Sequence, residues 1–117
     1  MAVLLHLTDM QGDFGATNGG LFVPGGDGVA TRINTFLDAL EPGMVDASVV
    51  TFDTHFWFSY FSSPECIPFP AIHCENGKEG WDLVIDTEKL SGKTDVYYGA
   101  KETFDFWQDK ATNNVDV

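Results

Sequence analysis

An aspartate and two histidines are spaced in a way that suits a metal site. Asp53 and His55 are two residues apart, and His73 follows in the next long segment. Side chains two residues apart point the same way from extended chain, so Asp53 and His55 can face one centre. Two imidazoles and a carboxylate, with water in open positions, suit Zn²⁺, Fe²⁺ or Mn²⁺. On spacing alone, the two histidines could equally be loop residues that hydrogen-bond to backbone groups.

Asp9 and Lys101 form a second candidate pair. Each lies at the end of an apolar run that predicts a strand. A carboxylate and an ammonium group brought together in this way can act as a base and a charge-stabilising cation. A purely structural ion pair fits the same two residues, and composition alone favours it.

The two cysteines are weaker candidates for a nucleophile. Cys74 adjoins His73, but neighbours in extended chain point apart, so a metal-bound His73 would direct Cys74 away from the site. We therefore expect Cys74 to be a buried structural thiol. Cys66 and Cys74 are too few for a disulfide framework, which favours a cytoplasmic protein.

The elements that must position these residues follow from the hydrophobic pattern. Apolar runs predict strands of a parallel sheet at residues 2–8, which we expect to be buried on both faces, at 47–52, also buried, and at 95–100. Between the first two, residues 12–28 are glycine-rich and predict a loop, and Asp27 predicts the N-cap of an amphipathic helix over 28–40. A strand, a helix and a strand in this order predict a parallel crossover unit.

The remaining segments carry less pattern. Residues 55–80 predict a long functional loop, 81–86 fit either a short strand or a helical turn, 101–110 predict the start of a helix or a loop, and 112–117 predict a frayed end. Since ligands bind at the carboxyl ends of parallel strands, Asp9, Asp53 and Lys101 should converge at one edge of the sheet.

The charge balance excludes several classes of partner. Eighteen acidic residues against six basic ones give a net charge of -12. This disfavours nucleic acid and anionic membrane surfaces, because both need clustered Lys and Arg. No apolar run reaches the ~20 residues of a membrane span.

Five short motifs occur in order along the chain. They are Leu4–Phe14 with its Asp-Met-Gln-Gly-Asp-Phe, Leu21–Asp27 with Val-Pro-Gly-Gly, Thr51–His55, Phe69–Cys74 with Ile-His-Cys, and Ala100–Trp107. This ordered set resembles the N-terminal part of nicotinamidases and pyrazinamidases, which belong to the isochorismatase-like cysteine hydrolase superfamily.

The resemblance implies a fold and a domain organisation. It implies a three-layer αβα architecture with a mostly parallel sheet, truncated here after the third or fourth strand. Residues 1–117 would then form a single domain that is incomplete on its C-terminal side. We expect the rest of the domain to come from a complementary C-terminal polypeptide, from a second copy in a homo-oligomer, or from a continuation of the same chain.

The resemblance also implies roles for individual residues. Asp9 matches the catalytic acid or base, and Lys101 matches the catalytic lysine. The implied ligands of a divalent metal, zinc first and Fe²⁺ or Mn²⁺ otherwise, are Asp53, His55 and His73, with Glu65 as the fourth and Ser59 as its runner-up. Phe14 and Trp57 are the aromatic residues expected to flank a flat substrate ring.

The implied reaction is hydrolysis of nicotinamide to nicotinate and ammonia through a cysteine thioester. Neither Cys66 nor Cys74 matches the position of the family's nucleophile, so we expect the chain alone to be inactive. Two alternatives stay open: a non-catalytic module that binds a metal and a pyridine, and an isochorismatase-like hydrolase of another small substrate.

Overall fold

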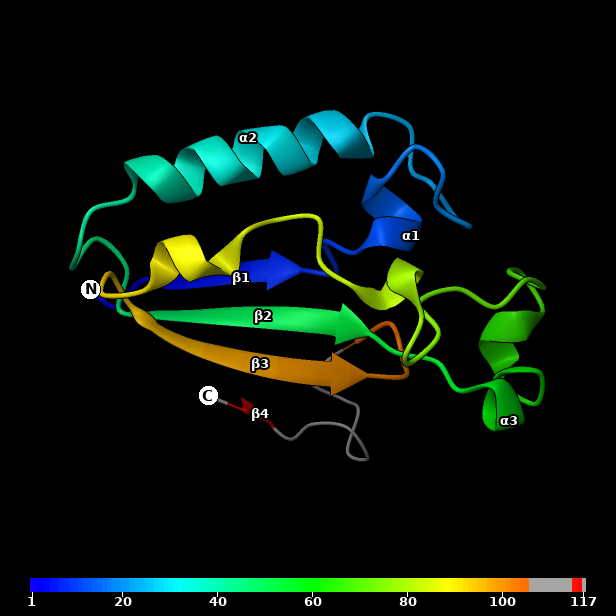
Figure 1. Cartoon of the computed structure of the whole chain (residues 1–117). Helices are drawn as coiled ribbons and strands as arrows, with labels where there is room; N and C mark the ends of the chain where they lie inside the picture. Colours follow the sequence, from blue (N-terminus) through cyan, green and yellow to red (C-terminus); the bar gives the residue numbers. More distant parts are fainter. Residues whose placement is uncertain (106–114, 117) are drawn as a thin grey trace.

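A computed structural model describes residues 1–105 and 115–116 of the chain (Figure 1). Strands β1 (Leu4–Thr8), β2 (Ala47–Asp53) and β3 (Asp95–Lys101) pair in parallel, in that order. The short strand β4 (Val115–Asp116) pairs antiparallel with β3. The predicted α/β class with a mostly parallel sheet is confirmed, whereas the frayed end predicted over 112–117 is wrong for the two residues of β4.

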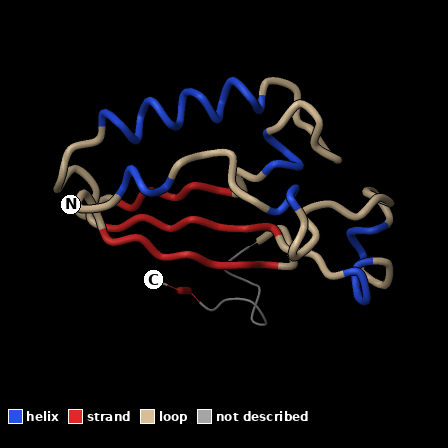
Figure 2. Tube along the Cα trace, in the orientation of Figure 1, coloured by secondary structure: helices blue, strands red, loops and turns tan. Residues whose placement is uncertain are grey.

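One long helix connects β1 to β2, and short helical turns make up the rest. The long helix is α2 (Gly26–Ala39). The others are α1 (Gly12–Gly15), α3 (Trp57–Tyr60) and the 3₁₀ turns η1 (Pro64–Cys66), η2 (Glu79–Trp81) and η3 (Thr87–Leu90). Loops and several of these turns gather beyond the carboxyl ends of the strands (Figure 2). None of the described helices has the length and apolar character needed to cross a membrane.

The entry to α2 differs from the sequence prediction. The helix begins at Gly26 rather than Gly28, and Gly25, with φ 86°, is its N-cap in place of Asp27. Gly26 packs against the Phe14 carbonyl, where an added Cβ would lie only 2.8 Å from that oxygen. The chain therefore needs glycine at both positions, and the predicted loop over 12–28 also contains the short helix α1.

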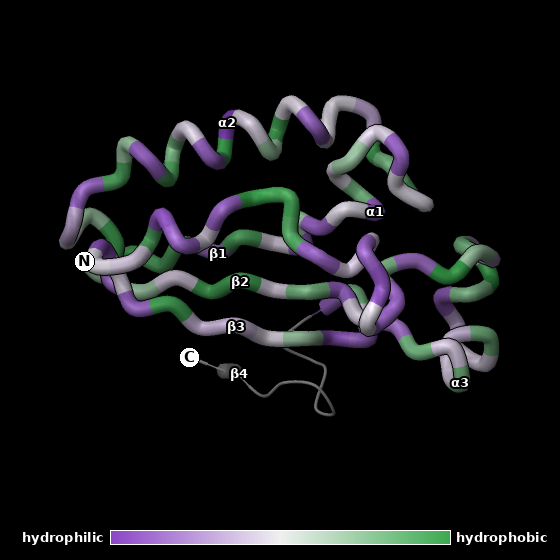
Figure 3. Tube along the Cα trace, viewed as in Figure 1, coloured by the Kyte–Doolittle hydropathy of each residue, from purple (hydrophilic) through white to green (hydrophobic). Residues whose placement is uncertain are grey.

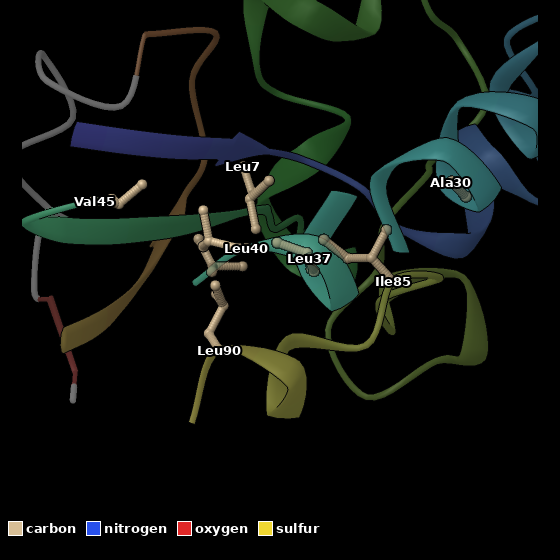
Figure 4. Close-up of a cluster of buried hydrophobic side chains, with 8 residues drawn as sticks. Leu7, Ala30, Leu37, Leu40, Val45, Ile85 and Leu90 are labelled. Carbon is tan, nitrogen blue, oxygen red and sulfur yellow. The ribbon is translucent and has the colours of Figure 1, made fainter. Parts of the chain in front are cut away.

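The hydrophobic core lies between α2 and one face of the sheet (Figure 4). Its buried members are Leu7, Ala30, Leu37, Leu40, Val45, Val50, Ile85 and Leu90. Leu37 lies on the face of α2 that the helical spacing predicts, and Leu40, the C-cap of α2, is buried too, but Val29 and Phe36 of the same pattern are exposed. The apolar stripe of α2 is therefore wider than the face that the sheet covers.

The two faces of the sheet are unequally covered. Strand β2 is buried or half-buried along its length, as predicted, and its middle is hydrophobic while its carboxyl end is hydrophilic (Figure 3). In β1, by contrast, Leu4, His6 and Thr8 face away from α2 and are exposed. The prediction that β1 is buried on both faces is therefore wrong within the described residues. These residues supply the sheet and the helical layer that covers one of its faces.

Candidate functional site

Three ionisable residues meet at the carboxyl ends of the three parallel strands. Lys101 Nζ lies 2.8 Å from Asp9 Oδ2 and 3.7 Å from Asp53 Oδ1. Asp9 adopts a left-handed backbone conformation (φ 52°) directly after β1, and its other carboxylate oxygen accepts a hydrogen bond from the Thr51 hydroxyl at 2.8 Å. Lys101 is 3% exposed, so this ammonium group is held almost entirely by carboxylates and the Thr103 carbonyl. The predicted convergence at the sheet edge is confirmed.

A second cluster adjoins this pair and contains two imidazoles and two carboxylates. Asp53 Oδ2 lies 3.1 Å from His55 Nε2 and 3.3 Å from His73 Nε2. The Glu65 carboxylate completes the ring, at 3.4 Å from His55 Nε2 and 3.2 Å from His73 Nε2. All four side chains are buried, and one ligand atom from each lies within 4.8 Å of the others. We call these four residues the metal cluster.

The cluster shifts the proton affinity of its members. Burial would raise the pKa of the Asp53 carboxyl, but hydrogen bonds to both imidazoles and the positive charges of His55 and Lys101 hold that pKa well below its usual range. For the His73 imidazole, burial acts in the other direction and would lower the pKa. Its hydrogen bonds to Asp53 and to the Ala71 carbonyl raise the pKa above its ordinary value. Opposite charges within the cluster therefore outweigh desolvation.

The donor set and its spacing fit a divalent metal. Tetrahedral zinc with bonds of about 2.0–2.1 Å holds neighbouring ligand atoms roughly 3.3–3.4 Å apart. The four imidazole–carboxylate distances in the metal cluster run from 3.1 to 3.4 Å. Buried imidazole and carboxylate ligands also suit Fe²⁺ and Mn²⁺. Asp53, His55, Glu65 and His73 are thus positioned to hold such an ion, once the longest separation among their ligand atoms, up to 4.8 Å, closes around it.

Hydrogen bonds behind His73 favour metal binding through its Nε2. Nδ1 lies 3.3 Å from the Ala71 carbonyl oxygen and 3.4 Å from the Tyr60 hydroxyl. A carbonyl can only accept, so Nδ1 carries the proton and Nε2 of the neutral ring keeps its lone pair for an ion. The Tyr60 hydroxyl donates to the Phe69 carbonyl, and burial, followed by the charge of Glu65, raises the pKa of Tyr60 to about 12.

A cavity of about 230 Å³ opens beside both clusters. Its polar wall is made by Asp9, Lys101 and members of the metal cluster, and its apolar wall by Phe14, Leu21, Phe69 and Phe104. We call it the Asp9 cavity. Phe14 lies against the metal cluster, with its ring centroid 5.7 Å from that of His73. A flat aromatic ligand could therefore contact Phe14 and reach the cluster from one position.

Trp57 does not line this cavity, and its contact with a substrate ring stays a prediction. Trp57 is 68% exposed on α3, and its ring contacts Phe61 at 5.0 Å between centroids. Phe69 and Phe104 line the cavity in its place. Ser59, the runner-up to Glu65, does not line the Asp9 cavity; it lines a neighbouring cavity of about 330 Å³, which His55 and Glu65 also line.

Neither described cysteine is placed to act as a nucleophile on a ligand of the Asp9 cavity. Cys74 is fully buried, as predicted, and neither it nor Cys66 lines that cavity. Burial, and then the charges of Asp53, Asp13 and Asp9, raise the pKa of the Cys74 thiol well above its usual value. The thiolate form that attacks an amide is therefore suppressed at Cys74.

Sequence reasoning missed three residues that support the site. Gln11 and Asp13 lie inside the first motif but show no period or pairing that indicates their contacts, which are backbone hydrogen bonds to Asp53 and Cys74. Tyr60 carries no sequence signal at all for its contact with His73. Side chains that act on backbone groups leave no pattern in residue types alone.

Comparison with known proteins gives a structural likeness. The sequence matches no family model and no curated protein. Among solved structures, it is similar to the pyrazinamidase of Pyrococcus horikoshii in complex with zinc, with a TM-score of 0.66 and 22% identity over 97% of this chain and 61% of that one. It is also similar to the nicotinamidase/pyrazinamidase of Bacillus subtilis, with a TM-score of 0.66 and 23% identity over 97% and 62% of the two chains.

A third similar structure is that of PnC1 from L. infantum in complex with nicotinate, with a TM-score of 0.60 and 23% identity over 87% of this chain and 50% of that one. The chain thus spans less than two thirds of the length of these three proteins. At such identities the likeness concerns the backbone arrangement. The described residues have the α/β fold of these solved pyrazinamidase and nicotinamidase structures.

Proposed function

We propose that this chain is the metal-binding and ring-binding part of a nicotinamidase-type amide hydrolase, which converts nicotinamide to nicotinate and ammonia. The observation that carries the proposal is the metal cluster, whose four ligand atoms converge within 4.8 Å beside a cavity that also holds Asp9 and Lys101. Residues 1–117 would form one domain, completed by residues outside this chain, in a cytoplasmic protein.

In this proposal Asp53, His55, Glu65 and His73 hold a divalent ion, with zinc as the first choice. When bound, the metal supplies a Lewis-acidic contact for the ring nitrogen of a pyridine carboxamide. The solved zinc complex of a pyrazinamidase and the nicotinate complex of PnC1 make this ion and this ligand class the first to test. Phe14 would support one side of the ring, and the walls of the Asp9 cavity would exclude water from it.

Asp9 and Lys101 would serve the chemical step. A carboxylate that is hydrogen-bonded to Thr51 and paired with a buried ammonium group can accept the proton of an attacking thiol. Lys101 would offset negative charge that develops on the amide oxygen or on Asp9 itself. Because Lys101 Nζ lies 2.8 Å from Asp9 Oδ2, the carboxylate can accept a proton and the ammonium group can offset a negative charge at the same edge of the cavity.

The thiol would come from outside the described residues. Since neither Cys66 nor Cys74 lines the Asp9 cavity, we propose that a continuation of the chain, a complementary polypeptide or a second copy in a homo-oligomer supplies it. The same observation favours a second candidate function, a non-catalytic module that binds the metal and a pyridine. Hydrolysis of another small substrate of the isochorismatase-like class is a further alternative for the completed enzyme.

The test is to load the full chain with Zn²⁺ and measure nicotinamide and nicotinate binding by titration calorimetry, together with ammonia release. Binding that requires zinc, and that His73→Ala abolishes, supports the proposed site. Ammonia release that Asp9→Ala abolishes identifies an enzyme, whereas binding without turnover identifies the non-catalytic module. Failure of the zinc-loaded chain to bind either pyridine would overturn the proposal.

A further inference from the structure

The last residue of β2 has lost its strand partner on the β1 side. Strand β1 pairs with β2 only as far as Thr8 with Thr51, and the left-handed Asp9 then turns the chain out of the sheet. The backbone N–H and C=O of Asp53 on that side would be buried without a partner, which is costly. Asp53 is 4% exposed and belongs to the metal cluster. Something else must satisfy these two backbone groups.

The side chain of Gln11 takes the place of the missing strand. Its Oε1 accepts a hydrogen bond from the Asp53 N–H at 2.8 Å, and its Nε2 donates to the Asp53 carbonyl at 2.8 Å. A glutamine ends in an amide with the donor and acceptor of a peptide unit, so it reproduces the pairing of a neighbouring strand. The second hydrogen of Nε2 goes to the Trp81 carbonyl at 2.9 Å. Gln11 is fully buried, and both hydrogens of its amide are used.

Asp13, two residues further along, holds the segment that carries His73. Its Oδ2 accepts a hydrogen bond from the Cys74 N–H at 2.7 Å, and its Oδ1 accepts one from the Gly20 N–H at 2.9 Å. Cys74 is left-handed (φ 47°), an unusual conformation for a residue with a side chain. The charge-assisted bond from Asp13 compensates for that strain, directly after His73 in the chain.

Gly80 makes room for this carboxylate. A Cβ at Gly80 would lie 2.3 Å from the Asp13 carboxylate atoms, so the Asp13 side chain is packed against backbone as well as hydrogen-bonded. The short stretch from Gln11 to Asp13 therefore reaches two different arms of the metal cluster. It contacts β2 at Asp53 and the loop between β2 and β3 at Cys74.

We propose that Gln11 and Asp13 are positioning residues, which fix Asp53 and His73 in the register that binding of a divalent cation requires. The inference rests on the proposed metal-binding function. It follows from the narrow range of the imidazole–carboxylate distances, 3.1 to 3.4 Å across four contacts. These contacts join the carboxyl end of β2 to Glu65 and His73 in the loop that follows it. Gln11 hydrogen-bonds to the end of β2 at Asp53, and Asp13 hydrogen-bonds to the loop at Cys74. Loss of partners that orient metal ligands lowers metal affinity by roughly 10- to 100-fold.

The first test replaces Gln11 by Met, which keeps the length of the side chain and removes the amide. Leu90→Ala is the matched control, since Leu90 is equally buried but lies in the core beneath α2. Co²⁺ serves as the probe, with its affinity measured by chelator competition and its ligand geometry by visible absorption, below the unfolding midpoint of each variant.

We expect Gln11→Met to bind Co²⁺ at least roughly tenfold more weakly with an altered absorption band, and Leu90→Ala to keep the wild-type band and an affinity within twofold of wild type. Equal weakening in both variants, or a wild-type band and affinity in Gln11→Met, would overturn the inference. Should Gln11→Met not fold, Asp13→Asn carries the same comparison, because its amide cannot accept from both backbone N–H groups.

The second test uses the metal-free protein, so its outcome does not depend on the proposed function. Amide hydrogen exchange should be slow at Asp53 and Cys74 in the wild-type chain. It should speed up at Asp53 in Gln11→Met and at Cys74 in Asp13→Asn, with Val50 in the centre of β2 unchanged. Unchanged exchange at Asp53 and Cys74 would refute the positioning role. A wild-type chain that binds no Co²⁺ but shows the expected exchange pattern would instead refute the metal site.

Discussion

The core beneath α2 and the loop that carries the metal cluster are stabilised by different interactions. Beneath α2, Leu7, Leu37 and Val50 form a core of aliphatic side chains that could be exchanged for others of similar size. In the loop at residues 54–81, which we call the metal loop, the buried groups include His55, Glu65 and His73. These polar groups are fixed by hydrogen bonds whose partners cannot be exchanged.

The comparison shows where stability and function are separated. The core beneath α2 needs only apolar volume at helical and strand spacing, and it supports the sheet whatever happens at the carboxyl ends of the strands. The metal loop contains three short helices of three or four residues, α3, η1 and η2, and a left-handed residue, Cys74, at φ 47°. Its order depends on specific side chains such as Tyr60, which contacts His73, and Gln11, which donates to the Trp81 carbonyl. Substitutions in the core should therefore lower stability and leave metal affinity unchanged, whereas substitutions in the metal loop should chiefly lower metal affinity.

The largest expected effect is on stability, in the core. Leu37→Ala removes a fully buried side chain and should lower the free energy of unfolding by about 3 kcal/mol, because it leaves a cavity beneath α2. Chemical denaturation measures this change. Val29→Ala, on an exposed position of the same helix, is the control and should cost under about 1 kcal/mol. Zinc affinity of both variants should stay within twofold of wild type under native conditions, and a large loss would show that the two regions are coupled.

The next effect is on metal affinity, in the metal loop. His73→Ala removes one of the four ligand groups of the metal cluster and should weaken Zn²⁺ binding by at least ~100-fold, more than the loss of an orienting partner. Competition with a zinc chelator measures the change. Ser59→Ala is the control, because Ser59 lies outside the Asp9 cavity and Glu65 holds the fourth position of the metal cluster. A Ser59→Ala variant that loses zinc as severely as His73→Ala would contradict the assignment of Glu65 as the fourth ligand.

The same contrast explains what could be predicted from the sequence. The amphipathic pattern of Ile33, Leu37 and Leu40 places α2 within two residues, because burial of apolar area repeats with the helical period. The start at Gly26 was missed, since it depends on contact between Gly26 and the Phe14 carbonyl, 12 residues earlier in the chain. Local spacing contains the first kind of information and none of the second.

The site was predicted in the same uneven way. Asp53 and His55 are two residues apart at a strand end, so their shared direction follows from extended geometry. Glu65 entered only through a family resemblance, because nothing in its spacing relates it to His73. Trp57 entered because its aromatic type suits a ring pocket, but α3 begins at Trp57 and its ring lies outside the Asp9 cavity, against Phe61.

A third prediction concerns the thiols of the metal loop. Cys74 is fully buried and its thiol pKa is raised by burial and by nearby carboxylates, whereas Cys66 is half-buried. Maleimide labelling at neutral pH should therefore modify Cys74 at least roughly tenfold more slowly than Cys66, with Cys66→Ala and Cys74→Ala used to read each site alone. Comparable rates would show that the metal loop opens far more often than the core. Denaturant should equalise the two rates.

The smallest expected effect is a pH dependence of the metal-free protein. In the folded chain the pKa of His73 lies above its ordinary value of 6.5, so the folded state holds this proton more tightly than the unfolded state does. The stabilisation is complete below pH ~6.5 and is lost as pH rises through the folded pKa. Asp53 makes no contribution to the slope there, because its lowered pKa leaves it ionised in both states. The unfolding midpoint should therefore fall above pH ~6.5 in the metal-free chain, and His73→Ala should flatten that fall.

Zinc binds the neutral imidazole, so a zinc-loaded chain should instead gain stability over the same range. If the unfolding midpoints of the metal-free wild-type chain and of His73→Ala changed with pH in parallel, His73 would not be the group that titrates.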